Sequence, residues 1–267
     1  MDKEIVKVLC LGDIVGQPGR RIVKHFVPLL RARHQVDLVI ANAENAAGGL
    51  GPDSNTAQEI LAAGVDILTL GDHTWHKKEF RSFLELHNDK CIRPANYSAG
   101  APGRGATRLS LRDGVDIGVL NLIGRVFLNL PLDCPFKVAD REISASLNGC
   151  KIIIVDLHAE ATSEKVAMSK YLDGRVSLLF GTHTHVQTAD QSVSQRGTAY
   201  ITDLGMCGSS QGVIGMHADV AVERFVTGIS QSYKIAPGPA MLNGVLVEFC
   251  AESGKALKIE RLHENLD

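Results

Sequence analysis

The sequence has no long hydrophobic run and no large excess of charge of either sign. No stretch of about 18 consecutive apolar residues occurs in its 267 residues, which argues against a membrane-spanning helix. Its beginning, MDKEIVKVLC, is charged and leads directly into a strand-like segment, so we expect no signal peptide. The formal net charge is -2, which argues against polymeric nucleic acid or anionic lipid as a partner, although bound metal ions could still attract phosphate locally.

The sequence also lacks paired cysteines. Its six cysteines are widely scattered and none forms a CxxC pair, so neither a structural zinc site nor a thioredoxin-type motif is indicated. Cys10, Cys150 and Cys250 lie in or beside apolar runs, as expected of reduced, mostly buried thiols. Because thiols stay reduced inside the cell, we predict a cytoplasmic protein.

What the sequence does contain is an alternation of short apolar runs and helical patterns, which predicts an α/β fold with a largely parallel sheet. We expect one domain spanning residues 1–267, since this length can bury a substantial core. Asp113-Gly114 predicts a hairpin turn. The predicted strands are 5–11, 37–41, 66–70, 107–111, 115–121, 152–157, 176–180, 198–202, 244–249 and 256–261, and the predicted helices are 20–33, 53–63, 77–87, 138–147, 163–172 and 219–226.

Side chains that can bind metal or phosphate follow many of the predicted strands at the point where each strand ends. The carboxyl ends of parallel strands line one crevice, so we expect these side chains to converge there. Taken singly, several of them could instead be turn residues, helix caps or buried histidines. The residues are Asp13, Asn42, Glu44, Asn45, Asp72, His73, Asn121, His158, His183 and His185.

The chemical types of these residues indicate phosphate-ester hydrolysis at a metal centre. His183 and His185 are two positions apart, so on an extended chain they point the same way. Carboxylate, amide and imidazole ligands suit Mn, Fe or Zn, and there are too many for one tetrahedral site. Two ions about 3.5–4 Å apart, bridged by a carboxylate, are usual for this reaction. One further histidine is then needed to protonate the leaving oxygen.

Five blocks of the sequence closely resemble the YmdB-like branch of the calcineurin-like metallophosphoesterases. They occur in the order found in that family, and the resemblance extends from about residue 5 to the segment 242–245. The last two blocks are long and highly specific. The blocks are LGDIVGQPGR (11–20), AENAAGG (43–49), GDHTW (71–75), DLHAEATSEK (156–165) and GTHTHVQTAD (181–190).

The resemblance implies a four-layer α/β/β/α sandwich and hydrolysis of 2′,3′-cyclic and sometimes 3′,5′-cyclic nucleotides, such as cAMP. It implies two divalent or mixed-valence metal ions, with Fe or Mn favoured and Zn or Mg as alternatives. A metal-bridged hydroxide would attack the phosphorus, and His73 would donate a proton to the leaving group. The family often forms homo-oligomers, although the sequence shows no interface signal. The implied ligands are Asp13, Glu44, Asn45 and His185 for one ion, and Glu44, Asp72, His158 and His183 for the other.

Asp72 departs from the family pattern, which normally has Asn at this position. Aspartate still permits ligation, but it adds negative charge beside an anionic substrate and should make metal-bound water less acidic. We therefore expect retained metal binding with altered turnover. This departure gives some weight to a metal-dependent nucleotide sensor with little turnover. A phosphomonoesterase or protein phosphatase on the same centre is a further alternative.

Several nearby residues stay ambiguous from sequence. Trp75 could stack on a base, but core packing is the favoured interpretation. For His76, too, a structural role is favoured over a functional one. Arg125 could bind phosphate or be a surface residue. Asn121 is expected to support the ligands. Ser163-Glu164-Lys165 is interpreted as capping the start of a helix.

Overall fold

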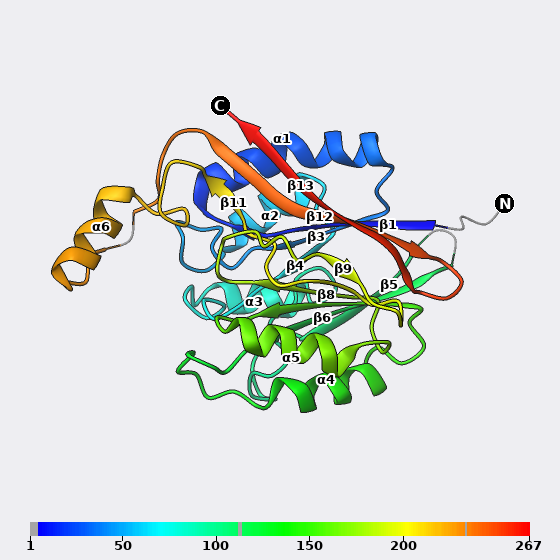
Figure 1. Ribbon diagram of the computed structural model, residues 1–267. Coiled ribbons are helices and arrows are strands. Elements are labelled where there is room, and N and C mark those ends of the chain that lie inside the picture. The colour runs from blue at the N-terminus through cyan, green and yellow to red at the C-terminus, as the bar shows by residue number, and fades with distance from the viewer. Residues whose placement is uncertain (1–4, 112–113, 233) are drawn as a thin grey trace.

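The computed structural model describes residues 5–111, 114–232 and 234–267, and it consists of two β-sheets with helices packed against them (Figure 1). In the first sheet the strand order is β2-β11-β12-β1-β3-β4, and β13 pairs with β12. The strands of this sheet are β1 (Ile5–Leu11), β2 (Asp13–Ile14), β3 (Leu38–Asn42), β4 (Ile67–Thr69), β11 (Met206–Ser209), β12 (Ala240–Cys250) and β13 (Ala256–Leu266).

The second sheet has the order β5-β6-β7-β8-β10-β9. Its central strands β6, β7, β8 and β10 are parallel, as are β1, β3 and β4 in the first sheet. The strands of the second sheet are β5 (Ala106–Ser110), β6 (Asp116–Ile123), β7 (Ile152–His158), β8 (Leu178–Thr182), β9 (Ser192–Val193) and β10 (Ala199–Ile201). The predicted α/β class is therefore confirmed as a mixed α/β fold with two sheets.

The apolar residues of the central strands alternate between two buried faces. In β1, Val8 belongs to a core shared with the second sheet, whereas Leu9 belongs to the core beneath the helices of the first sheet. In β7, Ile154 faces the core between the sheets and Val155 faces the helices of the second sheet. Strands buried on both faces carry nearly continuous apolar runs, which explains why β1 and β7 were visible in the sequence.

The helices cover the outer faces of the sheets. α1 and α2 lie against the first sheet and α4 and α5 against the second, while α6 stands apart (Figure 1). Asp53 caps α2 through a capping box with Thr56, which fixes where that helix begins. The helices are α1 (Gly16–His34), α2 (Ser54–Ala62), α3 (Phe80–Leu86), α4 (Pro135–Ser144), α5 (Thr162–Leu172) and α6 (Ala218–Thr227).

Some predicted boundaries were wrong for identifiable reasons. α1 begins at Gly16 rather than residue 20, because Pro18 is tolerated in a first turn whose N–H groups have no partner within the helix. α4 likewise begins at Pro135 rather than 138. The antiparallel pairing of β5 with β6 is confirmed, although Asp113 of the predicted turn lies outside the described residues. Within the described residues, no helix is both long and apolar enough to cross a membrane.

A buried ion pair ties α5 to the loop after β10. Lys165 Nζ lies 2.7 Å from Asp203 Oδ2, and both side chains are almost completely buried. Asp203 also accepts hydrogen bonds from the backbone and hydroxyl of Thr184 and from the backbone of Gly205. This carboxylate therefore connects three separate parts of the chain.

We predict that Lys165→Met lowers the free energy of unfolding by roughly 3–5 kcal/mol, because it leaves the charge of Asp203 buried and unpaired. Urea denaturation of purified protein would measure the change. Lys258→Met is the control, since Lys258 forms an exposed ion pair with Glu260 and such pairs contribute little. Equal stability of Lys165→Met and wild type would contradict the prediction.

Candidate metal centre

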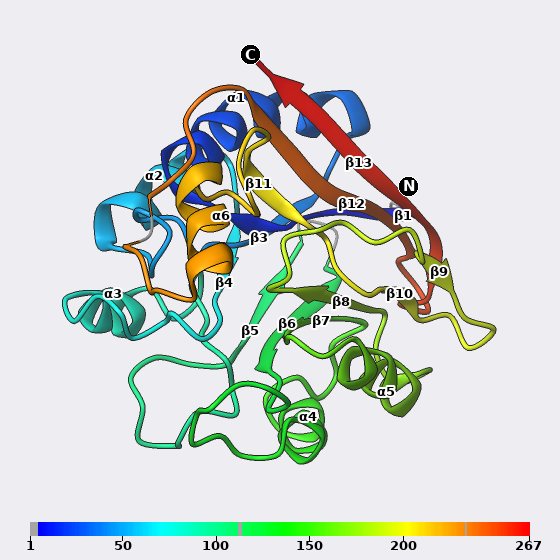
Figure 2. The ribbon, with the colours of Figure 1, turned by 60° about the vertical axis from the view of Figure 1, so that its left-hand side comes forward.

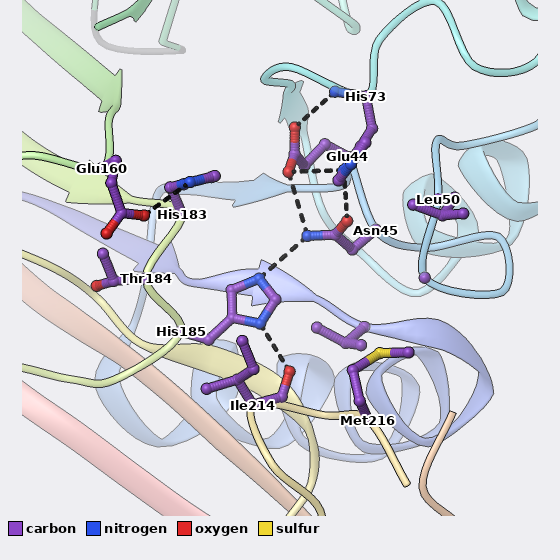
Figure 3. A pocket seen from close by; sticks show the side chains of 12 residues that line it. Glu44, Asn45, Leu50, His73, Glu160, His183, Thr184, His185, Ile214 and Met216 are labelled. Carbon is purple, nitrogen blue, oxygen red and sulfur yellow. Dashed lines mark hydrogen bonds and ion pairs between the residues drawn. The ribbon is translucent and has the colours of Figure 1, made fainter. Parts of the chain in front are cut away.

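The loops that follow β1, β3, β4, β7 and β8 meet at one edge of the two sheets, where a cavity of about 380 Å³ opens. Figure 3 shows that His183 and His185 approach this cavity from one side and Glu44, Asn45 and His73 from the other. The structure thus brings together the side chains that the sequence analysis singled out as candidate ligands. Whether they hold metal stays a prediction.

Four of the predicted ligands form one compact group. Ligand atoms of Glu44, Asp72, His158 and His183 all lie within 4.8 Å of one another. His158 Nε2 is 3.1 Å from Glu44 Oε1 and 3.0 Å from Asp72 Oδ1. His183 Nδ1 lies 3.0 Å from His158 Nε2 and 3.5 Å from Asp72 Oδ1. Two carboxylates and two imidazoles at this spacing suit a transition-metal ion.

The remaining predicted ligands lie on the other side of Glu44. Asn45 Nδ2 donates to Glu44 Oε1 at 3.2 Å and to His185 Nε2 at 3.1 Å, and His185 Nε2 is 3.8 Å from Asp13 Oδ1. The amide oxygen of Asn45 accepts from His73 Nδ1. In this arrangement the amide nitrogen of Asn45, not its oxygen, faces His185.

One oxygen of Asp13 lacks the partner that a buried carboxylate needs. Among the residues that the structure describes, its fully buried Oδ1 is one of few side-chain atoms left without a hydrogen-bond partner. Its other oxygen accepts from the backbone N–H of His183 at 3.0 Å. A buried carboxylate oxygen without a partner costs free energy. A metal ion beside Oδ1 would remove that cost.

Hydrogen bonds behind the histidines fix which ring nitrogens face the cavity. Thr182 Oγ1 donates to Asp156 and therefore accepts from His158 Nδ1. His183 Nε2 lies 3.1 Å from the carboxylate of Glu160, and His185 Nδ1 donates to the carbonyl of Ile214 at 2.9 Å.

As a result, His158 Nε2, His183 Nδ1 and His185 Nε2 are left to present lone pairs toward the carboxylates. Support of this kind from behind the ring is general for metal-binding histidines. His158 Nε2 and His183 Nδ1 would repel one another at 3.0 Å unless a proton or a cation lay between them. The donor set therefore fits a metal ion.

The pKa shifts of Glu44 and His158 have the same origin, which is the close approach of buried carboxylates and imidazoles. Burial would raise the pKa of Glu44, but the charge and hydrogen bonds of His158 and His73 outweigh it and lower the pKa to about 2. Burial disfavours protonated His158, yet Glu44, Asp72 and Asp13 raise its pKa well above the ordinary value. A proton on His158 thus balances the carboxylates in the absence of metal, and metal ions compete with it.

Glycine is required at position 71, directly before Asp72. A Cβ atom there would lie 2.2 Å from Glu44 Oε2 and 2.4 Å from His158 Nε2. The backbone must therefore pass directly against the candidate ligands. Asn121 supports the same segment, since its Oδ1 accepts from the N–H of Leu70 at 3.0 Å, as expected from the sequence.

Some supporting residues were not predicted from the sequence, and others were misread. Asp156 and Glu160 lie in the block DLHAEATSEK, but no role was expected for either. Glu164 does not cap α5, since no side-chain hydrogen bond caps the N-terminus of that helix. Its carboxylate instead accepts from the backbone of Arg125 and Val126. The one indication of these contacts in the sequence is that two charged residues, Glu164 and Lys165, occupy positions on the side of the helix that is otherwise buried.

Of the residues left ambiguous by the sequence, Trp75 packs on the core, whereas His76 and Arg125 lie at the surface. Trp75 packs against the core of the first sheet and meets Tyr97 edge to face, with ring centroids 5.4 Å apart, so the core-packing interpretation is confirmed. The side chains of His76 and Arg125 are exposed.

A mixed α/β fold with carboxylates and imidazoles gathered at the ends of its parallel strands defines a candidate metal-dependent enzyme. Comparison with known sequences makes the assignment specific. The chain belongs to the YmdB-like protein family, whose model matches residues 9–262. The resemblance noted from the sequence blocks is thereby confirmed.

Individual relatives cover nearly the whole chain. A 2′,3′-cyclic-nucleotide 2′-phosphodiesterase of Bacillus subtilis (strain 168) is 43% identical over 262 residues, which is 98% of each chain. The crystal structure of a novel phosphatase from Mycoplasma pneumoniae has a TM-score of 0.92 at 35% identity, covering 100% of this chain and 95% of that one. A hypothetical protein from Thermus thermophilus gives a TM-score of 0.91 at 39% identity, covering 98% and 100%.

We predict that Thr182→Val weakens metal binding by roughly 10–100-fold, because His158 Nδ1 loses the acceptor that orients its ring. Titration of metal-free protein with Mn²⁺ in a calorimeter would measure the change. Thr107→Val is the control, since Thr107 is also buried and its hydroxyl donates to Asp89 far from the centre. Unchanged affinity in Thr182→Val would show that this hydrogen bond does not support the ligand.

Proposed function

We propose that the chain is a dinuclear-metal phosphodiesterase that hydrolyses cyclic nucleotides, with 2′,3′-cyclic nucleotides such as 2′,3′-cAMP first and 3′,5′-cAMP second. The observation that carries the proposal is the position of Glu44. It lies between a group containing Asp72, His158 and His183 and a group containing Asn45 and His185. A carboxylate between two ligand groups is what a two-ion centre requires.

The proposed ligands are those that the family resemblance implies. When bound, two ions of Fe or Mn, or alternatively Zn or Mg, would neutralise the phosphoryl oxygens and lower the pKa of a water molecule. We propose that Asp13, Asn45 and His185 hold one ion and Asp72, His158 and His183 the other, with Glu44 shared. The amide of Asn45 would have to turn over for its oxygen to take part, because Oδ1 now accepts from His73.

His73 is the proposed proton donor to the leaving oxygen. It lines the cavity, and its Nδ1 is held by Asn45 Oδ1 at 3.1 Å. Burial lowers the pKa of His73, but the hydrogen bond and charge of Glu44 and the charge of Asp72 outweigh that effect and raise it. A raised pKa favours the protonated imidazole, which is the form that an acid catalyst requires.

The cavity also has apolar lining residues that suit the rest of a nucleotide. Val15, Leu50, Ile214 and Met216 line it together with His73 and several of the candidate ligands. A volume of about 380 Å³ lies within the range of small-molecule sites. An apolar surface beside a phosphate site fits a nucleoside better than a bare phosphate. The similarity to the Bacillus subtilis phosphodiesterase supports the same substrate class.

The same proposal covers the finer description of the fold. We propose a single domain arranged as a four-layer α/β/β/α sandwich and located in the cytoplasm. The two sheets share a core, α1 and α2 cover one outer face, and α4 and α5 cover the other. The six free cysteines are compatible with a reducing compartment.

A phosphomonoesterase is the second candidate function, because a close structural neighbour is described as a phosphatase. Protein loaded with Mn²⁺ or Fe²⁺ should be tested on 2′,3′-cAMP, 3′,5′-cAMP, a generic phosphodiester and a generic phosphomonoester. We expect the highest kcat/KM on 2′,3′-cAMP. Preference for the monoester would favour the phosphatase, and metal binding without turnover would favour a nucleotide sensor.

We predict that His73→Ala lowers kcat on the diester by roughly 10²–10⁴-fold while the bound metal stays unchanged, because only the proton donor is removed. Metal analysis and steady-state kinetics on the same samples would separate the two effects. His25→Ala is the control, since His25 is exposed on α1. An unaltered rate in His73→Ala would remove it from the proposed chemistry.

We predict that Asp72→Asn retains both metals and raises turnover, because it removes one negative charge next to the substrate phosphate while an amide oxygen can still ligate. Asp72 Oδ1 lies 3.0 Å from His158 Nε2, so loss of its charge should also weaken metal affinity. Metal content and kcat of the variant and wild type would be compared. If neither changes, the idea that Asp72 tunes this centre is wrong.

A further inference from the structure

The segment that joins β11 to β12 carries α6 away from the body of the molecule (Figures 1 and 2). Shortly before that helix, residues 213–216 form a tight turn. The N–H of Val213 donates to the carbonyl of Met216 at 2.8 Å, and the N–H of Met216 donates to the carbonyl of Val213 at 2.9 Å. Ile214 and Gly215 between them have φ values of 47° and 90°. Positive φ at both central positions is the mark of a type I′ turn, in which Asn-Gly is a preferred pair.

Isoleucine is an unfavourable residue for this turn. A β-branched side chain at positive φ is a genuine backbone outlier, whereas glycine tolerates such a value. The turn is held from outside, since a Cβ atom at Gly215 would lie 2.7 Å from Val15 Cγ1, and Met216 pairs with Ile235. Strain of this kind persists where the surroundings fix the backbone, and it collects at ligand-binding sites. The choice of isoleucine at Ile214 therefore needs a reason other than local stability.

The backbone of Ile214 has a task of its own, but that task does not explain the side chain. The carbonyl of Ile214 accepts a hydrogen bond from His185 Nδ1 at 2.9 Å (Figure 3). Any residue that adopts the same turn presents the same carbonyl, and asparagine or glycine would do so with less strain. The reason for isoleucine must therefore lie in what its side chain contacts.

The side chain of Ile214 lies at the cavity. It is 47% exposed, and it lines the cavity together with Val15, Leu50 and Met216. Figure 3 shows Ile214 next to the ring of His185. A ligand with its phosphate at the candidate metal centre would therefore have the rest of its body within reach of this side chain. Apolar lining of this kind supplies contact area to small-molecule ligands.

The polar side chains around the cavity are already engaged. Thr184 Oγ1 donates to Asp203 at 2.7 Å, and the carboxylate of Glu160 lies 3.1 Å from His183 Nε2. The other polar lining residues are candidate ligands and the candidate proton donor. Few hydrogen-bonding groups of the described lining therefore remain to read the edge of a base. Selection at Ile214 should depend on the apolar area of the base and not on the identity of its polar groups.

We propose that Ile214 is a specificity-determining residue, whose side chain packs on the base of a nucleotide that has its phosphate at the candidate metal centre. The inference rests on the proposed function and deepens it. The strained turn then has a purpose, since it places an apolar side chain beside His185 while its carbonyl holds that ring. Diesters with a base should be preferred to diesters without one, and the larger adenine and guanine to cytosine and uracil.

Ile214→Asn tests the proposal, because it gives the turn its preferred Asn-Gly pair and removes the apolar side chain. We expect Tm to be unchanged or raised, and metal content to be unchanged because the carbonyl that holds His185 remains. The probes are 2′,3′-cAMP and methyl riboside 2′,3′-cyclic phosphate, in which a methyl group replaces the base. The preference for 2′,3′-cAMP, measured as the ratio of the two kcat/KM values, should fall roughly tenfold.

Two further variants make the test specific. Ile214→Gly also fits the turn without strain and should lower the ratio to a similar extent. Ile229→Asn is the matched control, since Ile229 is 62% exposed beyond α6 and is not among the described residues that line the cavity. It should leave the ratio at its wild-type value.

The outcomes separate the inference from the proposed function. An unchanged ratio in Ile214→Asn, or a wild type that hydrolyses both diesters equally well, would overturn the inference and leave the proposed function standing. A lower Tm with equal losses on both diesters would also overturn it, by showing that the side chain serves the fold. If metal-loaded wild type hydrolyses neither diester, the proposed function fails. Calorimetric titration with the same two compounds then tests the inference alone, and equal affinities would overturn it.

Discussion

Buried negative charge is the constraint on which the rest of this structure depends. Asp13 and Glu44 are almost fully buried, and Asp72 lies beside them. Moving carboxylates out of water is costly unless positive charge compensates them. Burial raises the pKa of Asp13 despite the nearby histidines, and its Oδ1 still has no hydrogen-bond partner. The described residues thus concentrate negative charge that needs positive charge beside it, and protonated His158 supplies part of that charge in the absence of metal.

The two sheets divide this chemistry between them. The acidic candidates Asp13, Glu44 and Asp72 follow β1, β3 and β4 of the first sheet, whereas the imidazoles of His158, His183 and His185 come from β7 and β8 of the second. Neither sheet alone offers a balanced ligand set. An ion held by both would link the sheets across the edge of their shared core. Metal binding should therefore stabilise the packing of one sheet on the other, since ligand binding favours the folded state.

The sequence predicted the parts of this arrangement that have a local cause. β1 and β7 are short, mostly apolar segments of the kind expected for buried strands, and His183 and His185 stand out by their spacing. The short strands β2, β9 and β11 were missed, because two to four residues carry no periodic pattern. Glu164 and Lys165 were misread as capping residues, because their partners Arg125 and Asp203 lie 39 and 38 positions away. Contacts at such distances leave no periodic trace in the sequence.

Backbone strain in the short loop that carries His183 and His185 explains why the contacts of Asp203 with Thr184 and Lys165 exist. His183 and His185 have φ values of 99° and 65°, which residues other than glycine rarely adopt. Such strain persists only where the surroundings fix the backbone. Asp203 does this by accepting two hydrogen bonds from Thr184, between the histidines, while Lys165 balances its charge.

The ion pair buried beneath α5 is therefore part of what holds the imidazoles in place. Through Thr184, Asp203 fixes the backbone between the two histidines. It follows that the block DLHAEATSEK unites two tasks in one segment. His158 faces the candidate metal centre directly, and seven residues later Lys165 stabilises the loop that carries the other two imidazoles.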